Sequence, residues 1–284
     1  MNSAVAYIYG FLPTDFGRVR DAMMESATDN SVYTWENNSI YYITNGIWSP
    51  LKRVDDGWGF WDGVRSANLF LENFDPKVLE RFQYNEDYDE MIDKASKFSL
   101  EVRFLRAFYL FELAKRYGDI PLITRTYTQE EINSVRKTSF ADVIDFIAKE
   151  CTEITREGGL PEDGVRGETG RVTKGAALAL KSRALLYAAS DLHNPAHDLT
   201  KWEAAAKAAY EVIKMNKYQL PNVSTDPLYS DLGGNEVLKS KQLIFERRAI
   251  ATTSDFESRN EPMGYEGAEG GNTPTQNLVD AYEM

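Results

Sequence analysis

The sequence predicts a mainly α-helical protein, built from antiparallel helical hairpins between two loop-rich ends. Two observations predict this fold: five segments repeat apolar residues at helical spacing, and the gaps between them are short or contain Gly and Pro. Of the 284 residues, 43% are hydrophobic and 27% are charged, which is typical of a globular chain. A chain of this length buries roughly three quarters of its unfolded surface, so we expect a substantial core.

Three parts of the chain differ in composition and in hydrophobic periodicity, and together they are interpreted as one domain. Residues 1–56 form an aromatic-rich segment with little regular periodicity after an opening helix-like stretch. Residues 57–217 form the helical region, and residues 218–284 begin a loop-rich, incomplete lobe. In that lobe 242–250 is the one strand-like run, and a short helix begins near Thr275. The predicted helices cover 57–74, 86–117, 139–156, 174–191 and 200–216.

Several helix boundaries can be placed from local sequence alone. Asp75-Pro76 supplies an N-cap followed by proline at the first helical position. Ser139–Asp142 and Thr200–Glu203 each place a capping hydroxyl three residues before a carboxylate. Gly118 follows two basic residues and Tyr, and Pro comes soon after it, so the helix before it should stop there.

The predicted helix 86–117 is apolar on most sides, so neighbouring helices must cover it. Arg103 and Arg106 project among its apolar residues, where an unpaired charge would be costly, and each should have a carboxylate or carbonyl partner. The remaining polar strip of the helix consists of Glu101, Glu112 and Lys115.

Composition excludes two classes of function. The 32 basic and 44 acidic residues give a net charge of −12, and no basic cluster reverses it locally, so we expect no nucleic-acid partner. No apolar run approaches the ~20 residues of a membrane span. Residues 1–5 lack the basic start and apolar stretch of a signal peptide, which leaves two alternatives: a cytoplasmic protein, or a chain whose true beginning has been removed.

Four segments, in order along the chain, carry a resemblance to a known family. The run 99–123 resembles the central motif of the SusD/RagB family of Bacteroidetes outer-membrane glycan-binding lipoproteins. Phe11-Leu-Pro and 27–30 are similar to the N-terminal part of that family. The run 170–190 is similar to its next long helix, and 273–284 to a motif in the middle of its chains.

The resemblance implies a fold and a function. Family members stack helical hairpins like tetratricopeptide repeats, are lipid-anchored at the cell surface, and hand oligosaccharides to a SusC-like TonB-dependent outer-membrane transporter. The chain departs from the family in lacking the lipobox cysteine and in ending at a motif that other members continue beyond. We therefore expect a fragment of a surface-exposed outer-membrane lipoprotein, whose only membrane contact is a lipid anchor absent from this chain.

Small residues in the last predicted helix give modest support to helical stacking. Trp202, Ala205, Ala206 and Ala209 share one side of this helix, and small residues there would let the helix at 174–191 approach closely. The match to a tetratricopeptide repeat is degenerate, because that pattern wants Leu, Gly and Tyr where the three alanines stand.

A glycan site needs a flat aromatic platform beside polar groups, because sugar rings present apolar C–H faces and hydroxyl edges. The segment 33–48 interleaves both kinds of residue. Trp48 is the first choice for the platform, since turn residues on both sides could hold its indole at the surface. The alternative rings are Trp35, Tyr41 and Tyr42, and the candidate amides are Asn37, Asn38 and Asn45.

Other candidates have structural interpretations. Trp58 and Trp61 adjoin a helix start and should cover its core side. The pair His193 and His197 is interrupted by proline and lacks an obvious third ligand, so no metal is expected. Cys151 is interpreted as a core residue rather than a nucleophile.

The glycine-rich run 158–170 lacks the ending of a phosphate-binding loop. It is interpreted as a connection whose charged residues, with Arg171 beside them, are solvated.

The sequence therefore favours a non-catalytic, cofactor-free glycan-binding protein. Two alternatives stay open. One is an all-α glycoside hydrolase, which needs two carboxylates about 5 to 9 Å apart across a cleft. The other is a helical-repeat adaptor that binds a peptide.

Overall fold

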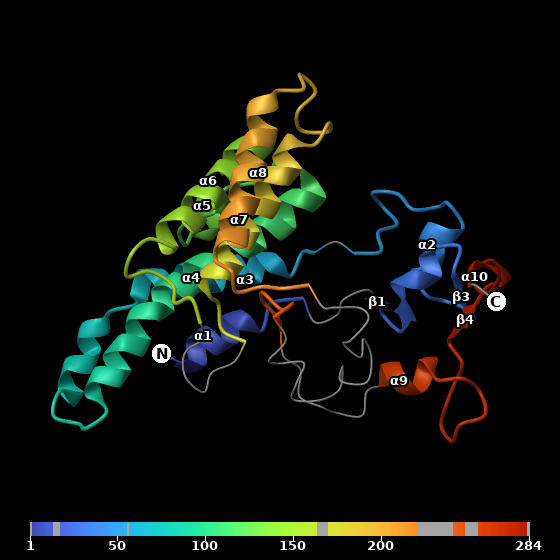
Figure 1. Cartoon of the computed structure of the whole chain (residues 1–284), viewed down its shortest axis with the longest axis horizontal. Helices are drawn as coiled ribbons and strands as arrows, with labels where there is room; N and C mark the ends of the chain where they lie inside the picture. The colour runs from blue at the N-terminus through green and yellow to red at the C-terminus, as the bar shows by residue number, and fades with distance from the viewer. Residues whose placement is uncertain are drawn as a thin grey trace. The chain divides into compact units, whose positions relative to one another are not determined.

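A computed structural model describes residues 2–13, 18–55, 57–163, 170–220, 241–247 and 255–282. The chain forms two compact units (Figure 1). The helical unit consists of Met1–Leu12 and Gly57–Arg247, and the small unit consists of Pro13–Asp56 and Arg248–Met284. One division thus falls between residues 56 and 57, where the sequence also changes texture, whereas the first twelve residues belong with the helices.

The helical unit contains all five predicted helices, which confirms the mainly α-helical class. Consecutive long helices pack on one another, α3 on α4, α4 on α6, α6 on α7 and α7 on α8, as Figure 1 shows. The elements are α1 (Asn2–Tyr9), α3 (Phe60–Asn73), the 3₁₀ helix η2 (Pro76–Phe82), α4 (Tyr88–Tyr117), α5 (Gln129–Ile132), α6 (Phe140–Ile154), α7 (Lys174–Ala189) and α8 (Leu199–Lys214).

The small unit joins segments from both parts of the chain. Strand β3 pairs antiparallel with β4, with Val32 opposite Thr273, and β1 pairs antiparallel with β2. Its small core contains Val19, Ala22, Tyr33 and Ile40. The elements are β1 (Arg18–Val19), β2 (Ala22–Met23), the 3₁₀ helix η1 (Met24–Ala27), β3 (Ser31–Tyr33), α2 (Tyr41–Thr44), α9 (Asp255–Asn260), β4 (Asn272–Pro274) and α10 (Gln276–Ala281).

Most of the predicted helix boundaries are confirmed. The Asp75 side chain accepts a hydrogen bond from the Lys77 amide at the start of η2, and Ser139 caps α6 in the same way. Gly118 ends α4 with a φ of 70°, a conformation that favours glycine. Thr275 caps α10, as expected.

Two local predictions are wrong. The N-cap of α8 is Asp198, whose carboxylate accepts hydrogen bonds from the amide and the hydroxyl of Thr200, so Thr200–Glu203 is not a capping box. A carboxylate two residues before Thr200 is the stronger acceptor. No strand forms at 242–247; the rest of the predicted strand lies outside the described residues.

Helix α4 is the centre of the core. Phe104, Tyr109 and Phe111 are fully buried, and α1, α3, α6 and α7 contact the helix around its circumference. Its predicted polar strip is not a solvent-exposed face, because Glu101 and Glu112 are each only 3% exposed. These carboxylates are buried with partners, which is the condition under which a folded chain tolerates a buried charge.

The buried carboxylates of α4 are neutralised by basic residues. Glu101 accepts hydrogen bonds from the Tyr9 hydroxyl and from Arg171 at 2.9 Å, so Arg171 is not a solvated charge as the sequence suggested. Glu112 pairs with Lys115 and Arg116, each at 2.7 Å. The Glu101–Arg171 pair therefore ties α4 to the segment before α7, whereas the two pairs of Glu112 lie within α4.

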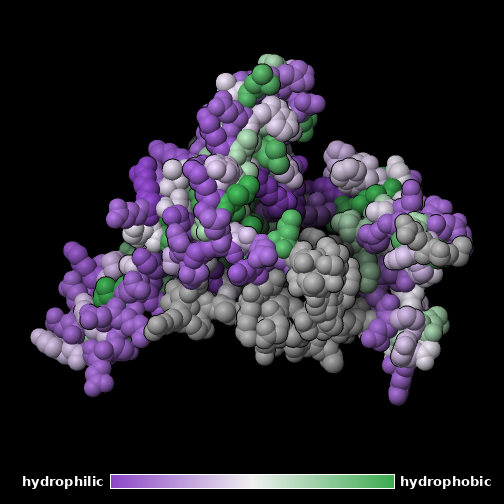
Figure 2. Space-filling model, viewed as in Figure 1, coloured by the Kyte–Doolittle hydropathy of each residue, from purple (hydrophilic) through white to green (hydrophobic). Residues whose placement is uncertain are grey.

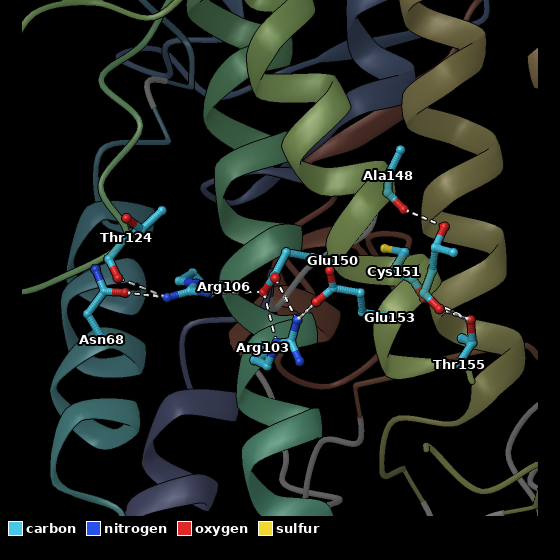
Figure 3. Close-up of polar contacts among 10 residues, drawn as sticks. Asn68, Arg103, Arg106, Thr124, Ala148, Glu150, Cys151, Glu153 and Thr155 are labelled. Atoms are coloured by element: carbon cyan, nitrogen blue, oxygen red, sulfur yellow. Dashed lines mark hydrogen bonds and ion pairs between the residues drawn. The ribbon is translucent and has the colours of Figure 1, made fainter. Parts of the chain in front are cut away.

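The partners expected for Arg103 and Arg106 are present (Figure 3). The Glu150 carboxylate of α6 pairs with Arg103 at 2.7 Å and with Arg106 at 3.0 Å. Arg106 also donates to the Asn68 side chain at 2.9 Å and to the Thr124 carbonyl at 3.1 Å. Burial alone raises the pKa of the Glu150 carboxyl, but the two guanidinium groups outweigh it and hold that pKa below its ordinary value.

Helices α7 and α8 approach closely through small residues, though not through the whole predicted set. Ala205 and Ala208 of α8 are buried, whereas Ala206 is exposed. The two buried alanines are three residues apart, so they lie on the same side of α8.

The two tryptophans at the start of α3 behave differently from one another. Trp61 packs against the core, as expected. Trp58, in contrast, is 61% exposed and meets the Tyr117 ring edge-on at a centroid distance of 6.1 Å, so the expectation that it covers the core is wrong.

The remaining candidates take structural roles. Cys151 is buried, and this burial raises the pKa of its thiol to about 12. The His193 ring stacks on Phe140 at a centroid distance of 3.5 Å. Among the described residues, no group of His, Cys, Asp and Glu could hold a metal ion. Across the part of the chain that the structure describes, every helix is too short or too polar to span a bilayer.

Candidate functional site

The aromatic segment 33–55 lies in the small unit, and Asn38 fixes its course. The Asn38 side chain accepts a hydrogen bond from the Ile40 amide at 2.9 Å and donates one to the Val19 carbonyl at 3.2 Å. This side chain is only 7% exposed. Asn38 therefore holds the turn that precedes α2, an Asx arrangement, and its amide is engaged within the fold.

Trp35 stands beside a polar cavity of about 270 Å³, which we call the Trp35 cavity. The indole is 49% exposed. Five charged residues line the cavity with it, and four of them, Arg20, Asp21, Arg259 and Glu269, lie outside the aromatic segment. The other lining residues are Tyr33, Glu36, Asn37 and Asn38.

Two arginines and three carboxylates line the Trp35 cavity. Arg259 pairs with Asp21 at 3.2 Å, and the Asn260 side chain donates to the Asp21 carbonyl at 2.9 Å. Burial and the nearby Asp21 carboxylate raise the pKa of the Tyr33 hydroxyl, so this phenol stays protonated at neutral pH. The cavity thus offers planar charged groups and a protonated phenol around one exposed ring.

Close backbone packing brings together the two chain segments that line the Trp35 cavity, 20–38 and 259–269. The Thr34 amide donates to the Gly271 carbonyl at 2.8 Å, directly after the β3–β4 ladder. A Cβ at Gly271 would come within 2.5 Å of the Arg259 carbonyl and 2.9 Å of the Tyr33 ring. Only glycine allows this approach, which places Arg259 next to Tyr33 and Asp21.

Trp48 and Asn45 lie farther along the same segment. Asn45 ends α2, Gly46 follows with a φ of 65°, and the Trp48 indole is 66% exposed. The backbone then turns at Ser49 and Lys52, which exchange hydrogen bonds. Neither Trp48 nor Asn45 lines the Trp35 cavity, so the structure does not bring all the predicted residues together.

The two tyrosines of α2 take different positions. The Tyr41 hydroxyl donates to the Tyr33 carbonyl, which ties α2 to β3. Tyr42 lines a second cavity, of about 420 Å³, with Lys52 and Arg53, and the Lys52 ammonium lies 6.0 Å from its ring centroid. Tyr42 is therefore the tyrosine of the pair that borders a cavity.

Four charged residues of the Trp35 cavity are not among the site residues predicted from the sequence. Arg20, Asp21, Arg259 and Glu269 sit in segments without a recognisable motif, and the two pairs are far apart along the chain. The β3–β4 pairing and the contacts of Asp21 with Arg259 and Asn260 bring them together, and a single sequence does not specify which distant segments pair.

Residues 14–186 match the SusD-like family, which is described as starch-binding and associating with the outer membrane. The chain belongs to the SusD-like family. No curated protein is found to match the chain. The resemblance seen in the sequence is thus confirmed over more than half of the chain.

Solved structures share the fold of this SusD-like chain. A SusD-like protein from Bacteroides fragilis is 27% identical, with a TM-score of 0.73 over 99% of this chain and 51% of that one. A laminarin-binding SusD-like protein is 23% identical, with a TM-score of 0.58 over 78% and 45%. Surface glycan-binding protein A from Bacteroides fluxus is 19% identical, with a TM-score of 0.61 over 99% and 61%. The SusD-like helical fold is confirmed, and the chain spans about half the length of the first of these proteins.

Proposed function

We propose that this SusD-like chain binds oligosaccharides through its small unit and does not cleave them. The observation that carries the proposal is the half-exposed Trp35 indole at the rim of a cavity with two guanidinium groups and several carboxylates. Membership of a family described as starch-binding supports carbohydrate as the ligand class.

The binding mechanism is capture. The Trp35 face stacks on the apolar C–H face of a sugar ring, while ring hydroxyls donate to carboxylates and accept from guanidinium groups at the ring edge. Because Asp21 and Arg259 already pair with each other, a neutral sugar exchanges hydrogen bonds there without leaving a charge unpaired. Trp48, with Asn45, is a second platform for a longer chain.

We also infer a location and a partner. Association with the outer membrane is part of the family description and supports a surface-exposed lipoprotein that delivers oligosaccharide to a SusC-like TonB-dependent transporter. The helical unit offers a docking face, since Leu186 of α7 and Leu199, Tyr210 and Ile213 of α8 are exposed. In Figure 2 hydrophobic colours are visible over α7 and α8, whereas the end formed by η2 and the start of α4 is mainly hydrophilic.

Calorimetric titration with maltoheptaose, laminarihexaose and a panel of other oligosaccharides tests the binding proposal. Trp35→Ala should weaken binding at least about tenfold, because a central aromatic anchor is lost, and Trp48→Ala should weaken it less. Trp202→Ala, an exposed indole on the helical unit, is the matched control and should bind like the parent.

Two results would contradict this account. If Trp35→Ala and Trp48→Ala both bind the oligosaccharide with full affinity, the binding site is not in the small unit. If the folded protein binds no glycan of the panel, the proposed function is wrong. Chromatography of the sugars after long incubation tests the non-catalytic claim, since shortened oligosaccharides would indicate a hydrolase.

Co-purification with a SusC-like transporter expressed in the same cells tests the partner. A Leu199→Glu, Ile213→Glu double variant should lose the transporter while keeping its affinity for the oligosaccharide. Trp48→Ala should keep the transporter, and loss of the transporter in that variant instead would place the docking face on the small unit.

A further inference from the structure

A third cavity lies wholly within the helical unit, at the start of α3, and is distinct from the proposed glycan site. This cavity, the Trp58 pocket, has a volume of about 720 Å³, within the range of about 300–1,000 Å³ that is usual for small-molecule sites. Aromatic rings form part of its wall: Trp58, Trp61, Tyr117 and Tyr127.

Aliphatic side chains form much of the remaining wall. Ile120 and Ile123 are buried, and Ile132 and Val135 continue the surface toward solvent. A bare sugar seated against these residues would leave its hydroxyls without partners, which is unfavourable. The wall instead suits an aromatic or alkyl group.

The Trp58 pocket is preformed by polar contacts from α3. The Asn68 side chain donates to the Ile123 and Arg125 carbonyls, each at 3.1 Å. The Glu72 carboxylate accepts from the amide and the hydroxyl of Thr126, each at 2.6 Å. Asn68 is itself held by the buried Arg106 (Figure 3). The loop after α4 is thus fixed in place, so a ligand would bind without a large entropic cost for ordering this loop.

Two further contacts close this loop. The Thr138 amide donates to the Ile120 carbonyl at 2.8 Å, which joins the two ends of the loop. Thr128 and Glu131 form a reciprocal capping box at the start of α5. Ile132 therefore lies on a short helix whose start is fixed by a capping box.

Three cations, Arg65, Arg125 and Lys137, and two carboxylates, Asp62 and Asp119, line the Trp58 pocket. Arg125 is neutralised by Glu131 at 3.0 Å, whereas Asp119 accepts a hydrogen bond from the Phe140 amide at 2.8 Å and keeps its charge. Within the described residues, Arg65 and Lys137 have no ion-pair partner, and Asp62 is the one lining carboxylate without a bonding partner. In a chain of net charge −12, Arg65 and Lys137 beside an apolar wall can hold the negative end of a ligand.

We propose that the Trp58 pocket binds a small amphipathic anion, with an aromatic or alkyl body against the isoleucines and a carboxylate or sulfonate between Arg65 and Lys137. This site goes beyond the proposed glycan-binding function and does not depend on it. The body is recognised by apolar contact and the anionic end by charge.

Fluorescence titration with 1-anilinonaphthalene-8-sulfonate, and with the neutral N-phenyl-1-naphthylamine, tests the proposal. The sulfonate should bind saturably at one site per chain. Ile132→Asp should weaken both probes by about tenfold or more, because it places a charge in the apolar wall. The double variant Arg65→Gln, Lys137→Gln should weaken the sulfonate by about tenfold and the neutral probe by less than about twofold.

Controls separate this pocket from other surfaces. Leu199→Asp, a charge at an equally accessible apolar position on α8, should leave both probes unchanged, as should Trp35→Ala. Trp58→Ala provides a second pocket variant if Ile132→Asp does not fold, as judged by circular dichroism and thermal unfolding. Trp58→Ala should weaken both probes.

Three results would overturn the proposal: binding that does not saturate, equal affinity in the parent and Trp58→Ala, or equal loss of both probes in the double variant. Displacement of the sulfonate by an oligosaccharide at its binding concentration would also overturn it, by assigning the pocket to sugar.

Discussion

The aromatic rings around α4 in the helical unit and the two tryptophans of the small unit serve different purposes. In the helical unit Phe104, Tyr109 and Phe111 are fully buried around α4. In the small unit Trp35 and Trp48 are 49% and 66% exposed, beside a small core of Val19, Ala22, Tyr33 and Ile40. The comparison teaches that ring content alone says little: burial decides whether a ring contributes to stability or remains accessible to a ligand.

Charged groups differ between the units in the same way. Glu150 is buried and bridges two arginines in the helical unit, whereas the Asp21–Arg259 pair of the small unit is about 40% exposed on each side. Breaking the first pair should unfold the protein more easily, while breaking the second should mainly change a binding surface. The predictions below test this division.

The largest expected contrast is between two aromatic truncations. Phe104→Ala should lower the free energy of unfolding by about 3–5 kcal/mol, because a cavity is left beside Phe108 and Phe245. Trp35→Ala should lower it by less than about 1 kcal/mol. Urea denaturation followed by circular dichroism measures both, and similar losses in the two variants would contradict the division.

The next effect comes from the buried ion pair. Glu150→Gln should cost about 3 kcal/mol of unfolding free energy, because Arg103 and Arg106 lose the negative charge between them. Glu203→Gln, which removes the exposed pair with Lys207, is the matched control and should leave stability unchanged within error. A neutral result for Glu150→Gln would show that the network does not stabilise α4.

The stabilising effect of Glu150 should depend on pH. Its carboxyl pKa is lower in the folded protein than its ordinary value of about 4.3, so the carboxylate stabilises the fold above that value and loses this effect as pH falls through the folded pKa. The stability gap between the parent and Glu150→Gln should therefore be full at pH 7 and shrink below about pH 4. A gap that stays constant to pH 3 would contradict the assigned ion pairs.

The smallest effect distinguishes two capping residues of α8. Asp198→Ala should lower Tm by about 2–4 °C, because the Thr200 amide loses its acceptor. Thr200→Ala should have a smaller effect, since the Asp198 cap to the amide remains. A larger loss of Tm in Thr200→Ala than in Asp198→Ala would indicate that Thr200 is the N-cap.

Local chemistry explains how much of the fold is predictable from the sequence. Ser139, Gly118 and Thr275 each act within one turn of chain, and their roles follow from neighbouring residues. The pairing of β3 with β4 and the burial of Glu101 depend on contacts distant in sequence, which no local pattern specifies.

The candidate site shows the same limit. The exposure of Trp35 and Trp48 agrees with an aromatic platform at the surface, but Asn38 is occupied by the backbone of its own loop. The cavity beside Trp35 owes its charges to Arg259 and Glu269, which enter through tertiary structure.

Hydrogen–deuterium exchange with and without saturating maltoheptaose or laminarihexaose, whichever gives the larger heat, tests the central claim most directly. The account predicts protection of peptides covering 18–38 and 255–271, while α3 and the loop 118–138 exchange at unchanged rates. Protection confined to the helical unit, with the small unit unchanged, would contradict it.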